Sequence, residues 1–267
     1  MRARRRWTRF ILPSYVALVF LYTLVPIGVM VLYGFNNAPG DRLTFAWHGF
    51  TFDWYRRLFE IPDLTTALVH SLEIATLSTL IAVVIGTPLA LAMTRHRFRG
   101  RGLTDLVILA DVAAPSVVVG ASLLGFYVTL NIPRGFLTIL IAHVAFNVAF
   151  VVVILRARIS GLNESLEEAA RDLGATAWTA FWRVTFPLIF PGIIAAALLG
   201  FALSIDDYII TSFVAGQTLT FPLWVYGAVK VVIPPQVFVM GTLIFAAGVV
   251  LAIASVVIQR RGRVAAT

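Results

Sequence analysis

Two adjacent carboxylates, Asp206 and Asp207, stand near the end of a long apolar run that begins at Pro187. Adjacent carboxylates disfavour each other's ionisation unless a cation or water compensates their charge. Consecutive helical positions point about 100° apart, so only one of the two is expected to face a water-filled path. The pair therefore predicts either a site that attracts cations or a solvated helix end.

Other polar side chains also interrupt apolar runs, where charged groups are costly and suggest a function by default. Asp111 either faces a watery path or accepts a hydrogen bond from Ser116 or a neighbouring helix. Glu73 lies near the end of its run and is expected at a membrane interface. His143 and Asn147, one helical turn apart, are typical of hydrogen bonds between helices rather than of ligands. Acidic residues outnumber basic ones along these runs, which favours a cationic solute.

Several chemistries are excluded by what the sequence lacks. There is no cysteine, which excludes disulfides, zinc–thiolate sites and iron–sulfur clusters. No phosphate-binding loop is present and the only lysine is Lys230, so the chain is not itself an ATPase. The four histidines show no nucleophile–base spacing, which argues against an intramembrane hydrolase. The sequence therefore predicts no catalytic residue, no metal site and no cofactor on this chain.

The elements that position these residues are long apolar helices. Hydrophobic residues make up 60% of the 267 residues, more than the surface of a soluble domain of this length could cover. Continuous apolar runs approach or exceed the roughly 20 residues that a helix needs to cross a bilayer. The sequence therefore predicts an all-α polytopic membrane protein, a single domain over 1–267. Six transmembrane helices are expected near residues 10–34, 68–94, 104–130, 136–157, 187–210 and 237–258.

The basic residues predict how these helices are oriented. The formal charge of +8 fits a chain oriented in its membrane better than one that binds nucleic acid. Lys and Arg number 16 in the segments on one side and 5 in those on the other. Because basic residues concentrate in cytoplasmic segments, both termini are expected in the cytoplasm. The basic segments are 1–9, 95–103, 156–186 and 259–267; the opposite segments are 35–67, 131–135 and 211–236.

Two further segments bear on this topology. The apolar run from Phe10 to Phe35 is too long for a signal-peptide core and lacks a convincing cleavage site, so it is expected to be the first span. The stretch 35–67 is rich in aromatic and acidic side chains. It forms either an aromatic belt at the outer interface or a contact with an external partner.

Residues 163–186 predict a pair of cytoplasmic helices separated by a bend. Asn163 or Ser165 suits the N-cap of the first helix, and Ser165 has capping-box spacing to Glu168. Gly174 suits the end of that helix, because a left-handed glycine there carries no Cβ penalty. The pattern predicts two short helices lying at the inner membrane surface.

A second amphipathic segment, residues 176–185, leads to Pro187 in the first turn of the fifth span. The first helix presents a compact apolar face, while three charged side chains are expected to stay in water. That face packs either on the protein's own loops or in a groove of a partner. The apolar face consists of Leu166, Ala169, Ala170 and Leu173, and the wetted residues are Glu167, Arg171 and Asp172.

A spaced motif runs through this helix pair. It reads Glu168-Ala169-Ala170, three residues, Gly174, nine residues, and then Val184-Thr185-Phe186-Pro187. The motif resembles the EAA motif of ABC-importer permeases, whose form ends in Ile-x-Leu-Pro, so Val184 and Phe186 are conservative departures. The resemblance covers nearly the whole chain and implies the type I importer permease (MetI-like) fold. It also implies a coupling helix region, 163–183, that docks in a cleft of an ATPase subunit through Glu168, Ala169, Ala170 and Gly174.

A second signature comprises Leu203-Ser204-Ile205-Asp206-Asp207-Tyr208, Thr211 to Gly216, and Pro222-Leu223-Trp224-Val225-Tyr226. It is similar to the PotC-type permeases of spermidine/putrescine importers, which carry a Ser-x-Asp-Asp segment in the fifth span. The resemblance implies a role in polyamine passage for Ser204, Asp206 and Asp207, with Asp111 and Trp54 as further candidates. The alternative is a permease for another small cationic or organic solute.

The resemblance implies an assembly in the bacterial inner membrane. A second, homologous PotB-like permease would complete the path, and a dimer of PotA-like ATPase subunits would bind on the cytoplasmic side. An extracytoplasmic PotD-like binding protein would deliver the substrate. ATP and Mg would belong to the ATPase, and this chain would not be an enzyme. An ion-driven secondary transporter is disfavoured, because the sequence shows no clear inverted repeat.

Overall fold

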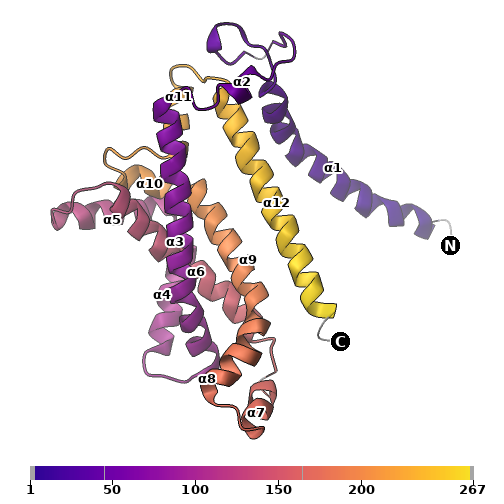
Figure 1. Ribbon diagram of the computed structural model, residues 1–267, viewed down its shortest axis with the longest axis vertical. Coiled ribbons are helices and arrows are strands. Elements are labelled where there is room, and N and C mark those ends of the chain that lie inside the picture. Colours follow the sequence, from indigo (N-terminus) through magenta and orange to yellow (C-terminus); the bar gives the residue numbers. More distant parts are fainter. Residues whose placement is uncertain (1–3, 45, 164, 265–267) are drawn as a thin grey trace. The chain divides into compact units, whose positions relative to one another are not determined.

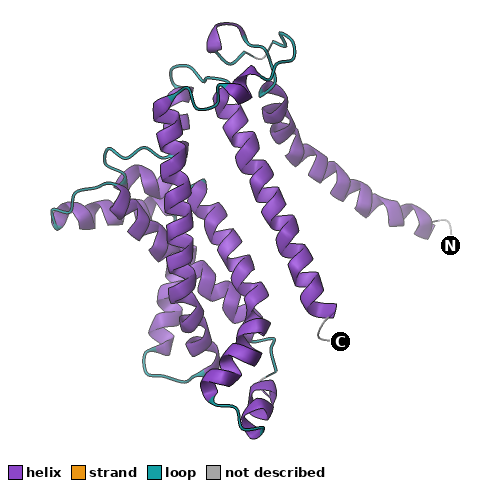
Figure 2. Ribbon diagram, in the orientation of Figure 1, coloured by secondary structure: helices purple, strands orange, loops and turns teal. Residues whose placement is uncertain are grey.

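The computed structural model describes residues 4–44, 46–163 and 165–264, which are helical apart from connecting loops and one isolated bridge (Figures 1 and 2). The first three residues of the basic N-terminal stretch, Glu164 in the coupling region and the last three residues of the basic tail lie outside the described residues. Within them, five helices are long and apolar enough to cross a membrane, and a bent pair would make a sixth span. The predicted all-α polytopic fold class is confirmed.

The chain forms two compact units, so the single domain expected over 1–267 contains two packed parts. Discontinuous segments build each unit, because the chain leaves the first unit at Ile61 and returns to it at Gly227. The first unit comprises Met1–Ile61 and Gly227–Gly248, and the second comprises Pro62–Tyr226 and Val249–Thr267.

In the first unit, a polar loop is folded around one asparagine side chain. Asn36 Nδ2 donates to Ala46 O at 2.8 Å, and Asn36 Oδ1 accepts from His48 N at 2.8 Å. Trp54 Nε1 donates to Asn36 O at 2.7 Å, and this tryptophan is only 3% exposed. The loop is therefore an ordered structure rather than a simple connection. The helical elements of the first unit are α1 (Arg4–Tyr33), η1 (Pro39–Asp41), α2 (Asp53–Arg56) and the first part of α12 (Gln236–Val264).

In the second unit, three long helices pack together: α3 (Pro62–Arg95), α6 (Phe136–Ile159) and α9 (Phe186–Ile205). Small residues let their backbones approach closely, as is usual where membrane helices pack. A Cβ at Gly86 would lie 2.6 Å from Val151 Cγ1, so this position has no room for a side chain. The resulting core is aliphatic on the side of Met93 and Leu155, which are fully buried.

The expected third span, 104–130, is not one straight helix. It consists of α4 (Arg101–Ala113) and α5 (Ser116–Thr129), which are bent by 111°. The physical reason lies at Pro115, whose ring disfavours the helical conformation at Ala114. Ala114 and Pro115 are both extended, with ψ of 135° and 131°.

The expected fifth span, 187–210, begins earlier and ends earlier. The helix is continuous from Ala177 to Ile205, through α8 (Ala177–Ala180), a π-helical turn η2 (Phe181–Thr185) and α9. Pro187 lacks an N–H and its ring would clash with the Arg183 carbonyl in a regular α-helix, and the wider π turn accommodates this. After Ile205 the chain breaks before α10 (Ile209–Val214), followed later by α11 (Phe221–Val229).

Candidate functional site

The acidic pair lies in the break between α9 and α10, and not on a continuous helix as expected from the sequence. Asp206 is the C-cap of α9, where the helical hydrogen bonding stops. Its side chain is exposed and makes no hydrogen bond or ion pair to another residue of the described chain. Asp206 is therefore an open carboxylate at the end of a membrane helix.

Asp207 points the other way and caps α10. Its Oδ2 accepts hydrogen bonds from Thr211 N and from Thr211 Oγ1, both at 2.8 Å. Its Oδ1 accepts a longer bond from Ile210 N at 3.4 Å. A carboxylate that accepts from the first free N–H groups of a helix stabilises that helix start. The side chain is only 16% exposed, so the Asp207 carboxylate faces the protein interior.

His143 connects this cap to the helix that precedes it. His143 Nδ1 lies 2.6 Å from Ser204 Oγ, and His143 Nε2 lies 2.9 Å from Thr211 Oγ1. The same Nε2 lies 3.4 Å from Asp207 Oδ2. Because Thr211 Oγ1 donates its only hydroxyl proton to Asp207 Oδ2, it accepts the hydrogen bond from His143 Nε2–H. The imidazole therefore links α6 to both α9 and α10.

The network continues into the core of the second unit. Ser204 Oγ lies 3.2 Å from Ser78 Oγ on α3, and Asn147 Nδ2 donates to Ser78 Oγ at 3.3 Å. All three of these side chains are buried. The expectation that His143 and Asn147 form hydrogen bonds between helices is thus confirmed. Buried polar groups are costly unless bonded, so the network fixes how α3, α6 and α9 meet.

The structure brings Ser204, Asp206 and Asp207 together but not the other candidates. Asp111 lies on α4, where its Oδ2 is buried and has no hydrogen-bond partner among the described residues, Ser116 included. Glu73 is exposed on α3. Trp54 belongs to the first unit and is buried against Asn36. No group of three or more histidine or acidic residues in the described chain could hold a metal ion.

The segment after α6 contains α7 (Ser165–Asp172), which ends as its glycine predicted. Gly174 has φ of 89°, in the left-handed region. Ala175 N donates to Ala170 O, and Gly174 N donates to Arg171 O, the bond pattern of a Schellman helix end. Asn163 Oδ1 accepts from Ser165 N at 3.1 Å at the other end.

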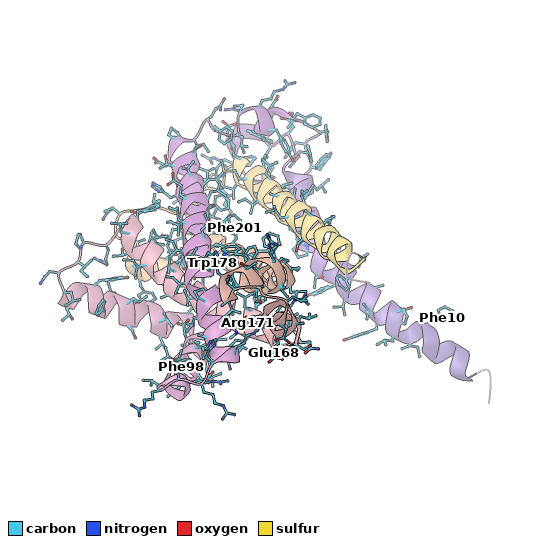
Figure 3. All side chains as sticks on the ribbon, turned by 60° about the horizontal axis from the view of Figure 1, so that its bottom comes forward. Phe10, Phe98, Glu168, Arg171, Trp178 and Phe201 are labelled. Carbon is cyan, nitrogen blue, oxygen red and sulfur yellow. The ribbon has the colours of Figure 1, made fainter. Side chains whose placement is uncertain are left out.

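Most side chains of α7 are exposed in the part of the chain that the structure describes. Glu168 and Ala169 are exposed, and Leu173 is 89% exposed. Figure 3 shows Glu168 and Arg171 on α7, with Trp178 of the following helix α8. Of the apolar face expected from the sequence, Leu166, Ala169 and Leu173 are exposed and Ala170 is half-buried, so the described residues leave most of this face uncovered.

Glu167 is the residue that sequence reasoning placed wrongly. It was expected in water, but its side chain is 20% exposed and forms ion pairs with Arg95 and Arg171. Thr185 Oγ1 also donates to Glu167 Oε2 at 2.8 Å. Burial raises the pKa of Glu167, but the hydrogen bonds from Thr185 and Arg95 outweigh it and hold the pKa below its usual value. The spacing of Glu167 to Arg171 indicates one pair, whereas Arg95 is too distant in sequence to be inferred.

Comparisons with known proteins agree with this architecture. Residues 82–264 match the family described as binding-protein-dependent transport system inner membrane component. The spermidine/putrescine transport system permease protein PotC of Escherichia coli K12 is 34% identical over 253 residues, which cover 94% of this chain and 95% of that protein. The putrescine transport system permease protein PotI of the same strain is 37% identical over 236 residues, covering 85% and 83%.

Solved structures show the same fold in more distant proteins. A bacterial ABC transporter involved in the import of the acidic polysaccharide alginate has a TM-score of 0.66, 19% identity and 96% coverage of both chains. An amino acid ABC transporter solved with histidines has a TM-score of 0.60 and 19% identity, covering 79% of this chain and 99% of that chain. These neighbours handle different solutes, so the fold does not determine the solute.

Proposed function

This chain belongs to the family of binding-protein-dependent transport system inner membrane components, and on that premise we propose that it is a permease subunit for polyamines. It is a multi-pass inner-membrane protein. Its proposed solutes are spermidine and putrescine, after which its relatives at 32% and 34% identity are named. The alternative is another small cationic or organic solute carried by the same architecture.

The observation that carries the proposal is the open carboxylate of Asp206. A polyamine is a flexible polycation, and a carboxylate with no partner in the protein can pair with one of its ammonium groups. Asp207 and Ser204 contribute differently, because they hold the α9–α10 break in place beneath Asp206. Asp111, whose Oδ2 has no hydrogen-bond partner within the described chain, is proposed as a second carboxylate of the path. Trp54 is left out of the path because it is buried.

The subunit is proposed to act within a larger assembly. A second, PotB-like permease completes the path, a PotD-like binding protein delivers the solute, and a dimer of PotA-like ATPases hydrolyses ATP with Mg. This chain supplies no catalytic residue and no cofactor. Both termini face the cytoplasm, which places α7 on the side of the ATPase. The exposed face of α7, with Glu168, Ala169 and the turn at Gly174, docks with the ATPase.

Competition in proteoliposomes tests the solute class. The chain is reconstituted with its partner permease, ATPase and binding protein, and ATP-driven uptake of labelled spermidine is measured. Excess unlabelled putrescine or spermidine is expected to reduce uptake, whereas an equal excess of a neutral sugar or of an acidic amino acid is not. Absence of ATP-driven uptake of either polyamine in an assembly that hydrolyses ATP would leave the fold intact and rule out the polyamine assignment.

A further inference from the structure

One carboxylate of the coupling helix α7 contacts both α3 and the π-helical turn before α9. Glu167 Oε2 forms an ion pair with Arg95 Nη1 and accepts a hydrogen bond from Thr185 Oγ1 at 2.8 Å. Glu167 Oε1 accepts from Arg171 Nη2 at 3.3 Å. Each of the two oxygens is therefore engaged, and the side chain is turned away from the exposed Glu168 next to it.

The two groups bound by Glu167 Oε2 sit at the ends of membrane helices. Arg95 is the last residue of α3, and Thr185 is the last residue of the π-helical turn that leads into α9. Further along, the same two helices meet at Ser78 and Ser204, whose hydroxyl oxygens are 3.2 Å apart. Glu167 therefore contacts the end of α3 and the turn that leads into α9, the two helices that meet at the buried serine pair.

The surroundings of this carboxylate make the connection firm. Arg95 and Glu167 are only 16% and 20% exposed, so water and salt screen their attraction less than they screen a surface pair. Thr185 is buried. By contrast, α7 is an eight-residue helix, too short to be stable in isolation, and it exposes Leu166 and Leu173.

These observations divide α7 into an outer face, available to the ATPase, and an inner face fixed by Glu167. We propose that Glu167, Arg95 and Thr185 form the joint that transmits movement of the ATPase-bound helix to α3 and α9. Glu168 belongs to the outer face and serves docking, whereas Glu167 is a positioning residue that serves transmission. The proposal rests on the proposed function, since it requires an ATPase that binds α7.

The joint is tested in the reconstituted assembly by comparing Glu167→Gln with the neighbouring Glu168→Gln. Glu167→Gln is expected to keep the ATPase bound and hydrolysing ATP, while polyamine taken up per ATP falls roughly tenfold, the loss of about 1.4 kcal/mol of coupling. Glu168→Gln is expected to reduce ATPase binding, so that uptake and hydrolysis fall together. An unchanged uptake-to-hydrolysis ratio in Glu167→Gln would overturn the proposal.

Exchanging the two charges distinguishes loss of the ion pair from a simple folding defect. Arg95→Glu combined with Glu167→Arg restores the ion pair in reverse, so the double variant is expected to recover coupling that each single variant loses. Thr185→Val replaces the hydroxyl that donates to Glu167. It is expected to lower the polyamine taken up per ATP by a smaller factor than Glu167→Gln does. If the double variant assembles normally but takes up no more polyamine per ATP than the worse single variant, the Arg95–Glu167 pair does not transmit the movement.

A solute-independent readout separates this proposal from the polyamine assignment. The chain has no native cysteine, so a cysteine introduced as Ile209→Cys, at the start of α10, reports alone. Trapping the ATPase with ATP and vanadate is expected to change its labelling rate several-fold, and Glu167→Gln is expected to abolish that change. A response that persists in Glu167→Gln contradicts the joint, whereas a normal response without polyamine uptake contradicts only the solute.

Discussion

Asp206 and Asp207 are adjacent in sequence but have different surroundings. Asp206 faces outward with no partner in the described chain, whereas Asp207 accepts two 2.8 Å hydrogen bonds from Thr211 and lies close to His143. Neutralising either residue is expected to reduce transport for a different reason: Asp206→Asn removes a charge available to solute, whereas Asp207→Asn weakens the structure that presents this charge. Measurements of activity alone cannot distinguish these roles, whereas measurements of stability can.

The first prediction concerns the buried pair of His143 and Asp207. His143→Ala removes the hydrogen bonds that link α6 to Ser204 and Thr211, and Asp207→Asn removes the charge from the α10 cap. Each is expected to destabilise the detergent-solubilised protein by roughly 1–3 kcal/mol, measured by denaturation. Because the two residues share Thr211, the double variant is expected to lose less than the sum of the single losses. Strict additivity would show that they act independently.

The second prediction concerns pH and the Glu167 carboxylate. Burial raises the pKa of Glu167 in the folded protein, but hydrogen bonds from Thr185 and Arg95 outweigh burial and hold this pKa below its usual value. A lowered pKa contributes stability above the unfolded-state pKa, and that contribution is lost as pH falls through the folded pKa. The stability difference between wild type and Glu167→Gln is therefore expected to be largest at neutral pH and to shrink under acid. Two denaturation curves that stay equally far apart from pH 7 to acid would contradict this.

At the scale of elements, close helix packing is concentrated at small residues. Gly86 on α3 faces Val151 on α6, where a Cβ would lie 2.6 Å from Cγ1. Gly125 on α5 has no neighbouring atom within 4 Å of such a Cβ. These two helical glycines therefore form a matched pair for measuring what the α3–α6 contact contributes.

The third prediction follows from that pair. Gly86→Ala is expected to destabilise the second unit by about 1–3 kcal/mol, because the helices must separate to admit the methyl group. Gly125→Ala is expected to be neutral or slightly stabilising, since alanine favours helix and meets open space. Thermal denaturation in detergent measures both variants. Equal melting behaviour of the two would contradict the tight α3–α6 packing.

The sequence predicted the elements better than their ends. Long apolar runs identified the helices, since apolar length is a local property, and Gly174 predicted the end of α7 because left-handed glycine is local too. Pro115 bends its span by 111°, whereas Pro88 and Pro191 lie inside continuous helices, so a proline alone does not predict a bend. The end of α9 at Ile205 lies next to Ser204, whose contact with His143 joins residues that are distant in sequence. The position of Glu167 depends on Arg95, which is 72 residues away, and no local pattern encodes such a contact.

At the scale of the molecule, the distribution of basic residues predicts the orientation in the membrane. The absence of native cysteine makes that orientation directly measurable. In the fourth prediction, Arg99→Cys is expected to react with a membrane-impermeant thiol reagent only from the cytoplasmic side. Arg42→Cys is expected to react only from the outside. Labelling of both from one side, in sealed vesicles of known orientation, would contradict the proposed topology.

In the proposed function, Asp206 offers cationic solute an open carboxylate that Asp207, His143 and Ser204 hold in place. To test this role, ATP-driven spermidine uptake is measured with Asp206→Asn and with the charge-conserving Asp206→Glu, each in the reconstituted assembly. Asp206→Asn is expected to lose roughly tenfold in uptake at subsaturating spermidine, the equivalent of about 1.4 kcal/mol. Its denaturation midpoint and basal ATP hydrolysis are expected to stay unchanged, and Asp206→Glu is expected to retain most uptake. Wild-type uptake by Asp206→Asn would show that solute does not depend on the Asp206 carboxylate. A loss of stability equal to that of Asp207→Asn would show that Asp206 has a structural role instead.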